Sequence, residues 1–151
     1  MKSPRLGHEG SSVLTVPDDR GVFRITIPVA TADIDELNHV NNIVYLRWVQ
    51  EVAYAHWNTL GSEELKMKYK WVVLRHEIDY HAPALPRDVI IASTWIDVPE
   101  GPRQKRYVSI QRKSDEMILA SACTSWCLLD AVSGRPKRVP LEITSVFGLK
   151  N

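Results

Sequence analysis

Asn41-Asn-Ile-Val-Tyr-Leu-Arg-Trp-Val-Gln-Glu-Val-Ala-Tyr-Ala-His-Trp-Asn-Thr-Leu60 is a run of twenty residues without proline or glycine. Its apolar residues recur at intervals of three and four, which is the period of one helix face, at Leu46, Val49, Ala53, Trp57 and Leu60. Gly61 follows at the position where a helix C-cap is expected. The pattern predicts one helix over residues 42–59, with a short helical turn over Glu63–Lys68 after it.

Segments with the composition of β-strands lie on both sides of this helix. Val22–Val29 precedes it and is rich in β-branched residues, and Pro28 favours a place at a sheet edge or a bulge. Four more segments follow, separated by runs of turn-forming residues, at 71–80, 89–98, 106–113 and 117–129. From Ile90 to Val98 every second side chain is apolar except Thr94, so this face is expected to meet the core.

The order of these segments limits the architecture. One amphipathic helix cannot cover both faces of a sheet of about five strands, so the simplest arrangement is an α+β domain in which a curved antiparallel sheet wraps around the helix. The outer face of that sheet, with Trp95, Tyr107 and Ser109, and one edge strand are then left uncovered. We therefore expect a homodimer, or a tetramer made of two such dimers.

Length and charge narrow the class of protein. The chain has 151 residues and a mass of 17.2 kDa, which fits one domain over residues 21–151 preceded by a flexible arm over 1–20. A net charge of +1 gives no field that would attract nucleic acid or a membrane surface. The longest uncharged run, Met117–Leu129, is too short for a membrane helix, and the first residues contain no apolar signal segment. A cytoplasmic location is expected.

The segment between the first strand and the helix gathers polar groups of the kind used in catalysis. Ala32–Tyr45 contains three acids, one histidine and three asparagines, and it leads into the helix N-terminus. The free amides and the dipole of such a terminus suit an anion or a developing oxyanion. A carboxylate beside them can act as a base or a nucleophile on a carbonyl that they polarise. On the residues alone, Asn41 or Asn42 could equally serve only as the N-cap, with the acids in a solvated loop.

The same segment resembles a known family motif. Asp33-x-Asp35-x3-His39-Val40-Asn41-Asn42-x2-Tyr45 is similar to the D-x-D-x-x-G-H-V-N-N-x-x-Y signature of the 4-hydroxybenzoyl-CoA thioesterase-like hotdog proteins. Ile78–Ala84 with Asp88, and Trp126–Asp130, resemble two further segments of that family. Asn38 stands where the family has glycine, and asparagine tolerates a positive φ, so the turn can be kept. The resemblance implies the hotdog fold and an acyl-CoA thioesterase that releases a free acid and coenzyme A.

Site residues are implied by this resemblance, position by position. Asp35 falls on the catalytic carboxylate, as nucleophile or general base, and the amide that polarises the thioester carbonyl falls near Asn42. His39 and Asn42 would line the reaction centre. Tyr45 could border the acyl pocket, and Asp33 would fix the loop by hydrogen bonds.

A basic cluster is the second candidate site. Arg103, Lys105 and Arg106 follow a Gly-Pro turn, and cationic side chains close together can hold phosphate oxygens. The residues alone favour a solvated basic hairpin that protects a sheet edge. The family resemblance implies instead that they contact the nucleotide of coenzyme A, often across a subunit boundary. Arg135, Lys137 and Arg138 form a second basic set.

The expected small-molecule partner is an acyl-CoA. No separate cofactor is expected because coenzyme A is part of the substrate, and no metal is expected because the histidines lack metal-ligand spacing. Two other functions stay open at this point. One is a non-catalytic hotdog module that binds acyl thioesters or lipids, and the other is a thioesterase that takes acyl carrier protein instead of coenzyme A.

Overall fold

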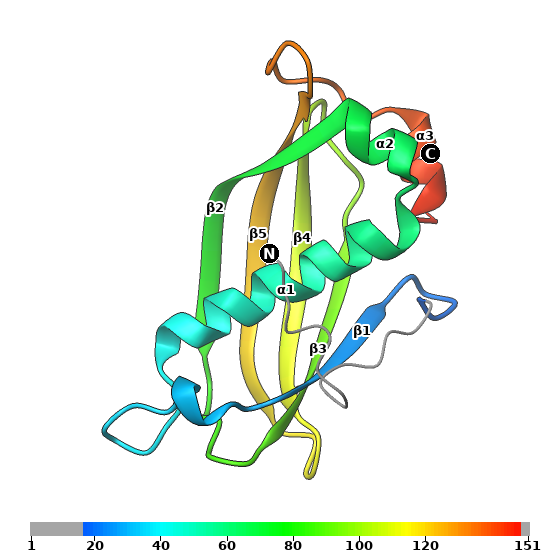
Figure 1. Cartoon of the computed structure of the whole chain (residues 1–151). Coiled ribbons are helices and arrows are strands. Elements are labelled where there is room, and N and C mark those ends of the chain that lie inside the picture. Colours follow the sequence, from blue (N-terminus) through cyan, green and yellow to red (C-terminus); the bar gives the residue numbers. More distant parts are fainter. Residues whose placement is uncertain (1–16, 149–151) are drawn as a thin grey trace.

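The computed structural model describes residues 17–148 (Figure 1). Its long helix and its strands match the segments expected from the sequence to within three residues at each end. None of the helices in this range is long and apolar enough to cross a membrane. The elements are β1 (Phe23–Pro28), the 3-10 turn η2 (Thr31–Asp33), α1 (Asn42–Leu60), α2 (Glu63–Lys68), β2 (Tyr69–Tyr80), β3 (Val89–Ile96), β4 (Arg103–Arg112), β5 (Ile118–Asp130) and α3 (Leu141–Val146).

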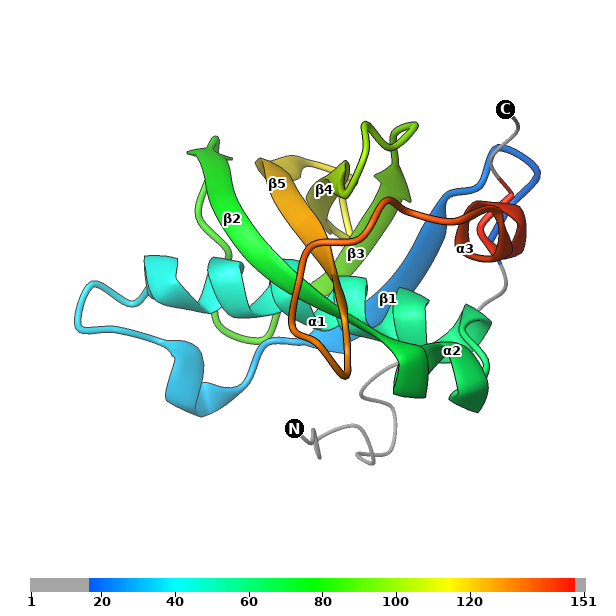
Figure 2. The same cartoon turned by 90° about the horizontal axis from the view of Figure 1, so that it is seen from above.

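The strands form one antiparallel sheet of five strands in the order β1-β3-β4-β5-β2. Figures 1 and 2 show this sheet curving around α1, which lies across its concave face. The predicted α+β arrangement, a curved antiparallel sheet wrapped around one long central helix, is therefore confirmed. β1 and β2 are the two edges of the sheet.

The core lies between α1 and the inner face of the sheet. Trp48 and Val52 of α1 are fully buried there, against a sheet face that includes Ile90 of β3 and Ile110 of β4. The alternation predicted for β3 is present, since Ile90, Ala92 and Thr94 are all fully buried. Val98 lies beyond the end of the strand and is exposed, so the apolar face ends earlier than predicted.

The ends of α1 are fixed by its flanking residues. At its start, Asn41 Oδ1 accepts a hydrogen bond from the Ile43 N–H at 2.9 Å. At its end, the Gly61 N–H donates to the Trp57 carbonyl oxygen at 2.7 Å, and a Cβ at position 61 would lie 2.7 Å from that same oxygen. The close approach of the backbone, rather than a positive φ, therefore requires glycine at this C-cap.

Two features near the C-terminal end of α1 differ from the sequence expectation. The short helix α3 is not predicted, and its Ile143 packs with Leu65 and Leu128 in a second apolar cluster. β4 begins at Arg103, three residues before the predicted position 106. This earlier start places both Gln104 and Arg106 on the buried face of the strand.

The arm expected over residues 1–20 lies mostly outside the described residues. Within the described part, the Asp18 carboxylate accepts hydrogen bonds from the N–H groups of Arg20 at 2.9 Å and Val22 at 3.0 Å. It also pairs with Arg24 at 3.2 Å. These contacts join the chain at Asp18 to the start of β1.

Candidate active site

The loop before α1 is a tight turn that brings Asp35 and His39 together. Ile34 and Val40 form an antiparallel bridge across it. The Asp35 N–H donates to the His39 carbonyl oxygen at 2.9 Å, and the Asn38 N–H donates to the Asp35 carbonyl oxygen at 3.0 Å. Asn38 has a φ of 63°, in the left-handed region. The turn expected with asparagine in place of glycine is therefore formed.

Asp33 fastens this loop to α1. Its side chain is buried, and its Oδ1 accepts a hydrogen bond from Arg47 Nη2 at 3.0 Å while its Oδ2 accepts one from the Ala30 N–H at 3.1 Å. The Asn41 N–H donates to the Asp33 carbonyl oxygen at 2.9 Å. The prediction that Asp33 fixes the loop by hydrogen bonds is confirmed.

The carboxylate of Asp35 is half-buried, and only one of its oxygen atoms is fixed by the turn. Oδ1 accepts a hydrogen bond from the Leu37 N–H at 2.9 Å and a longer one from the His39 N–H at 3.4 Å. Oδ2 accepts no hydrogen bond from any residue in the range 17–148. The second oxygen atom is therefore available to a bound molecule.

The first amide of α1 has no protein acceptor. Asn41 is the N-cap, because its side chain accepts from the Ile43 N–H and its carbonyl oxygen accepts from the Val44 N–H at 2.9 Å. The N–H of Asn42 finds no acceptor within the described part of the chain. A free amide at the positive end of a helix of 19 residues can donate to an oxygen atom on which negative charge develops.

A cavity of about 480 Å³ joins these groups. The residues expected at the reaction centre and the acyl pocket all border it, namely Asp35, His39, Asn42 and Tyr45. Its lining also includes Tyr80, the last residue of β2, and three residues of the segment that follows, His81, Ala82 and Pro83. A carboxylate and a free helix amide in one cavity are the groups needed for attack on a polarised carbonyl.

Tyr45 holds two parts of this cavity together. Its ring is buried, its hydroxyl accepts a hydrogen bond from the Ala84 N–H at 2.7 Å, and burial raises its pKa. The Val40 N–H donates to the Ala84 carbonyl oxygen at 3.0 Å, and the Tyr80 hydroxyl donates to the Asn42 carbonyl oxygen at 3.3 Å. Tyr45 therefore fixes the segment after β2 against α1, in addition to bordering the cavity.

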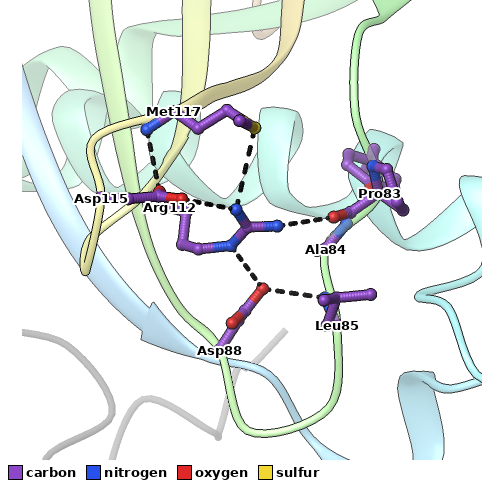
Figure 3. Close-up of polar contacts among 8 residues, drawn as sticks. Pro83, Ala84, Leu85, Asp88, Arg112, Asp115 and Met117 are labelled. Carbon is purple, nitrogen blue, oxygen red and sulfur yellow. Dashed lines mark hydrogen bonds and ion pairs between the residues drawn. The ribbon is translucent and has the colours of Figure 1, made fainter.

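Arg112, at the end of β4, anchors the same segment (Figure 3). Its Nε donates to Asp88 Oδ2, its Nη2 to the Pro83 carbonyl oxygen and its Nη1 to Asp115 Oδ2, each at 2.9 Å. The hydrogen bond with Asp88, and then that with Asp115, holds the pKa of Arg112 above its usual value. Sequence reasoning does not single out Arg112, because Pro83 lies 29 residues away and no local pattern joins the two.

Two histidines border the cavity. His39 is exposed beside Asp35, and His81 Nε2 lies 3.1 Å from Ser121 Oγ. Among residues 17–148, no three His, Cys, Asp or Glu side chains are grouped as a metal ion would require. His39 is therefore a polar neighbour of the catalytic carboxylate candidate, without a partner group that would make it a ligand.

The structure separates the three cations expected to hold phosphate. Arg103 and Lys105 are exposed on the outer face of β4, whereas Arg106 is buried on the inner face. Arg106 Nη1 donates to His56 Nδ1 at 2.9 Å and to Thr94 Oγ1 at 3.0 Å. This corrects the expectation of one three-cation site, because the alternation of a strand turns Arg106 away from the other two side chains.

Arg103 and Lys105 also lie far from the cavity of Asp35 in the same chain. Arg103 pairs with Cys127 of β5, whereas Tyr80, which borders the cavity, pairs with Ala120 of β5. A separation of seven residues is roughly 23 Å along a strand. Contacts of these two cations with coenzyme A would therefore involve the cavity of another copy of the chain.

Comparisons with known proteins agree with this architecture. The thioesterase-like superfamily matches residues 29–147. No curated protein matches the sequence. Solved structures with the same fold include a 1,4-dihydroxy-2-naphthoyl-CoA thioesterase from Synechocystis, which is 17% identical with a TM-score of 0.73, over 83% of this chain and 95% of that chain.

Two other solved structures extend this comparison. A hypothetical protein from Staphylococcus aureus, in complex with CoA, is 16% identical with a TM-score of 0.75, over 83% of this chain and 80% of that chain. A 12:0-ACP thioesterase from Umbellularia californica is 18% identical with a TM-score of 0.73, over 87% of this chain and 51% of that chain. At these identities the likeness is one of fold.

Because the family match spans α1, all of β2–β5 and both segments that border the cavity, the chain belongs to the thioesterase-like superfamily. The predicted hotdog fold and the predicted enzyme class, a thioester hydrolase, are confirmed at the level of this family.

Proposed function

We propose that the protein hydrolyses an acyl-CoA thioester to a free acid and coenzyme A in the cavity between the loop before α1 and the segment after β2. One observation carries this proposal. The half-buried carboxylate of Asp35, with Oδ2 free of protein donors, and the unpaired amide of Asn42 border the same cavity in the described chain. A carboxylate beside an oxyanion donor is the minimum that thioester hydrolysis requires.

In the proposed reaction, the thioester carbonyl oxygen accepts a hydrogen bond from the Asn42 N–H. Asp35 either attacks the carbonyl carbon or removes a proton from the water molecule that attacks it. Each route forms a carbon–oxygen bond and moves the carbonyl electron pair onto the oxygen atom that Asn42 stabilises. When this intermediate collapses, the carbon–sulfur bond breaks and coenzyme A leaves as a thiolate, which takes up a proton. On the first route, water then hydrolyses the anhydride between the acyl group and Asp35.

Coenzyme A is the favoured carrier of the acyl group. The Synechocystis structure is that of a CoA thioesterase, and the Staphylococcus aureus structure is in complex with CoA. This chain covers 95% and 80% of those two chains but 51% of the 12:0-ACP thioesterase. An acyl-carrier-protein thioesterase is the second candidate, and the last of these structures supports it.

A thiol-release assay tests the proposal. Short, medium, long and aromatic acyl-CoAs are offered, and the same acyl groups are offered on acyl carrier protein and on pantetheine. We expect release of free coenzyme A from at least one acyl-CoA, at a higher kcat/KM than from the matching carrier-protein thioester. Release from the carrier-protein thioesters alone would favour the second candidate. Release from none of them would contradict catalysis and favour a module that only binds acyl thioesters.

A further inference from the structure

A second cavity, of about 350 Å³, lies at the other end of α1. It is bordered by the last turns of α1, from Ala53 onward, and by the first residues of β2 and the inner faces of β4 and β5. Asn42 and Ala53 are separated by roughly 17 Å along a helix, so this cavity is distinct from that of Asp35. The reaction proposed above uses none of its residues.

Arg106 borders this cavity as a buried cation without a counter-charge. Only 8% of its surface is exposed, and burial lowers its pKa to about 9, which leaves it protonated at neutral pH. It forms no ion pair within residues 17–148. Its Nη1 is used by His56 and Thr94, whereas Nε and Nη2 have no acceptor in the described chain. An unpaired buried charge is costly, so a ligand that supplies the opposite charge is favoured.

The two protein partners of Arg106 are both neutral. A guanidinium can only donate, so His56 Nδ1 must accept, and the ring carries its proton on Nε2. Burial, and then the charge of Arg106, lowers the pKa of His56 to about 3. The Thr94 hydroxyl donates to the Tyr107 carbonyl oxygen at 2.9 Å, and its oxygen atom accepts the hydrogen bond from Arg106. Neither group compensates the positive charge.

The lining of this cavity is rich in aromatic side chains and contains no acid. Three tryptophans and two tyrosines border the cavity: Trp57, Trp71, Trp126, Tyr54 and Tyr69. Trp126 is 6% exposed, and its Nε1–H has no acceptor among the described residues. Lys66 and Lys70 also border the cavity, whereas no Asp or Glu does. The cavity thus combines flat aromatic walls with the positive charge and the unused Nε and Nη2 donors of Arg106.

We propose that this cavity is a binding site for an organic carboxylate with a flat, apolar body. The parallel Nε and Nη2 donors of Arg106 match the two oxygen atoms of a carboxylate, the geometry in which arginine binds this group most strongly. The aromatic side chains that border the cavity would cover the body of the ligand. Acids of this class are also what thioester hydrolysis releases, so the site would bind such an acid away from Asp35.

Isothermal calorimetry with 2-naphthoate tests this proposal, with 2-naphthamide as the neutral ligand of the same shape. We expect one naphthoate per chain and at least tenfold weaker binding of the amide. Inorganic phosphate at the same concentration should not displace naphthoate, because it lacks the apolar body. Asp35→Asn should bind naphthoate as the wild type does, so this result does not depend on the proposed catalysis.

Variants on β4 locate the bound acid. Arg106→Met should fold, since an apolar side chain of similar length replaces a buried charge, and should bind naphthoate at least tenfold more weakly. Arg103→Met, on the outer face of the same strand, is the matched control and should bind it normally. If Arg106→Met fails to fold, Arg106→Lys decides, because it keeps the charge and removes the paired donors, for an expected loss of threefold or more. Equal binding of acid and amide, or undiminished binding by the folded variants, would overturn the proposal.

Discussion

Asp33 and Asp35 are two residues apart, yet their surroundings give them different roles. Both carboxylate oxygens of Asp33 accept hydrogen bonds, from Arg47 and from the Ala30 N–H, in a buried position. Asp35 keeps one oxygen free of protein donors at the edge of a cavity. The motif predicts this division, but it does not predict Arg47, because the partner of Asp33 lies 14 residues further along the chain.

Tyr45→Phe should destabilise the protein. The change leaves the buried N–H of Ala84 without its acceptor, so we expect the free energy of unfolding to fall by about 1–3 kcal/mol. Urea denaturation measures this difference. Tyr54→Phe is the matched control, because Tyr54 is exposed and its ring contact with Trp126 is kept. Equal stability of the two variants would contradict the anchoring role of the Tyr45 hydroxyl.

Burial of neutral His56 should make stability depend on pH. Its pKa is lowered from 6.5 to about 3, so the unfolded chain takes up a proton below pH 6.5 that the folded chain does not. The contribution of neutral His56 to the free energy of unfolding is therefore fully present above pH 6.5. It decreases by about 1.4 kcal/mol per pH unit as the pH falls from 6.5 toward 3. The groups in contact with the His56 ring are Phe23, Phe147 and the cation of Arg106, so the one charged neighbour among them is positive.

Thermal unfolding between pH 7 and pH 4 measures this slope, with His56→Gln as the comparison. A glutamine side chain can still accept from Arg106 but does not titrate. We expect a shallower loss of Tm in the variant as the pH falls. Parallel curves for the two proteins would show that His56 is not the group responsible.

At the scale of elements, the periodicity of apolar residues predicts most of the sheet. It misplaces the start of β4, and with it the position of Arg106. A strand that starts at Arg103 has Gln104, Arg106, Val108 and Ile110 on one face, and all four are buried. A strand assumed to start at 106 gives no reason to separate Arg106 from Arg103 and Lys105. The alternation with Val108 and Ile110 was the signal that could have placed Arg106 inside. The second cavity could not be predicted, since it joins α1, β2, β4 and β5.

The exposed pair on β4 should affect binding of coenzyme A and not the chemical step. Contacts with phosphate act equally in the ground state and the transition state, so Arg103→Ala with Lys105→Ala should raise KM and leave kcat nearly unchanged. Each exposed charge contributes about 1 kcal/mol or less, so we expect KM to rise by about three- to tenfold, and less in high salt.

An acyl-pantetheine, which lacks the nucleotide, is the control substrate for this double variant. It should barely distinguish the variant from the wild type. If KM for the acyl-CoA does not change, the pair is only a solvated part of the sheet. The second basic set, Arg135, Lys137 and Arg138, would then be the next candidate for phosphate contacts.

At the scale of the whole molecule, the two sheet edges differ. β1 has 6 residues and ends in Pro28, which cannot donate a hydrogen bond to another strand. β2 has 12 residues and exposes apolar side chains, including Val72 and Leu74. On the outer face, Trp95 stacks on Tyr107 with ring centroids 6.0 Å apart. A long, apolar edge and an aromatic outer face favour assembly of several chains.

We therefore predict a homodimer at minimum, and a tetramer if the outer faces also pack together. Light scattering at micromolar concentration should give at least twice the 17.2 kDa of one chain. Val72→Lys places a charge on the β2 edge and should shift the protein toward the monomer. A single species of 17.2 kDa in the wild type would contradict the prediction.

The carboxylate of Asp35 is the group on which the proposed catalysis depends, and one comparison of two variants tests it. Asp35→Asn keeps the shape of the side chain but removes its action as base or nucleophile, so thiol release from the best acyl-CoA should fall by about 10²-fold or more. Glu36→Gln makes the same chemical change at the next residue, which is exposed, and should leave the rate nearly unchanged. Circular dichroism checks that both variants fold. A rate for Asp35→Asn within about threefold of the wild type would contradict the assignment of the active site.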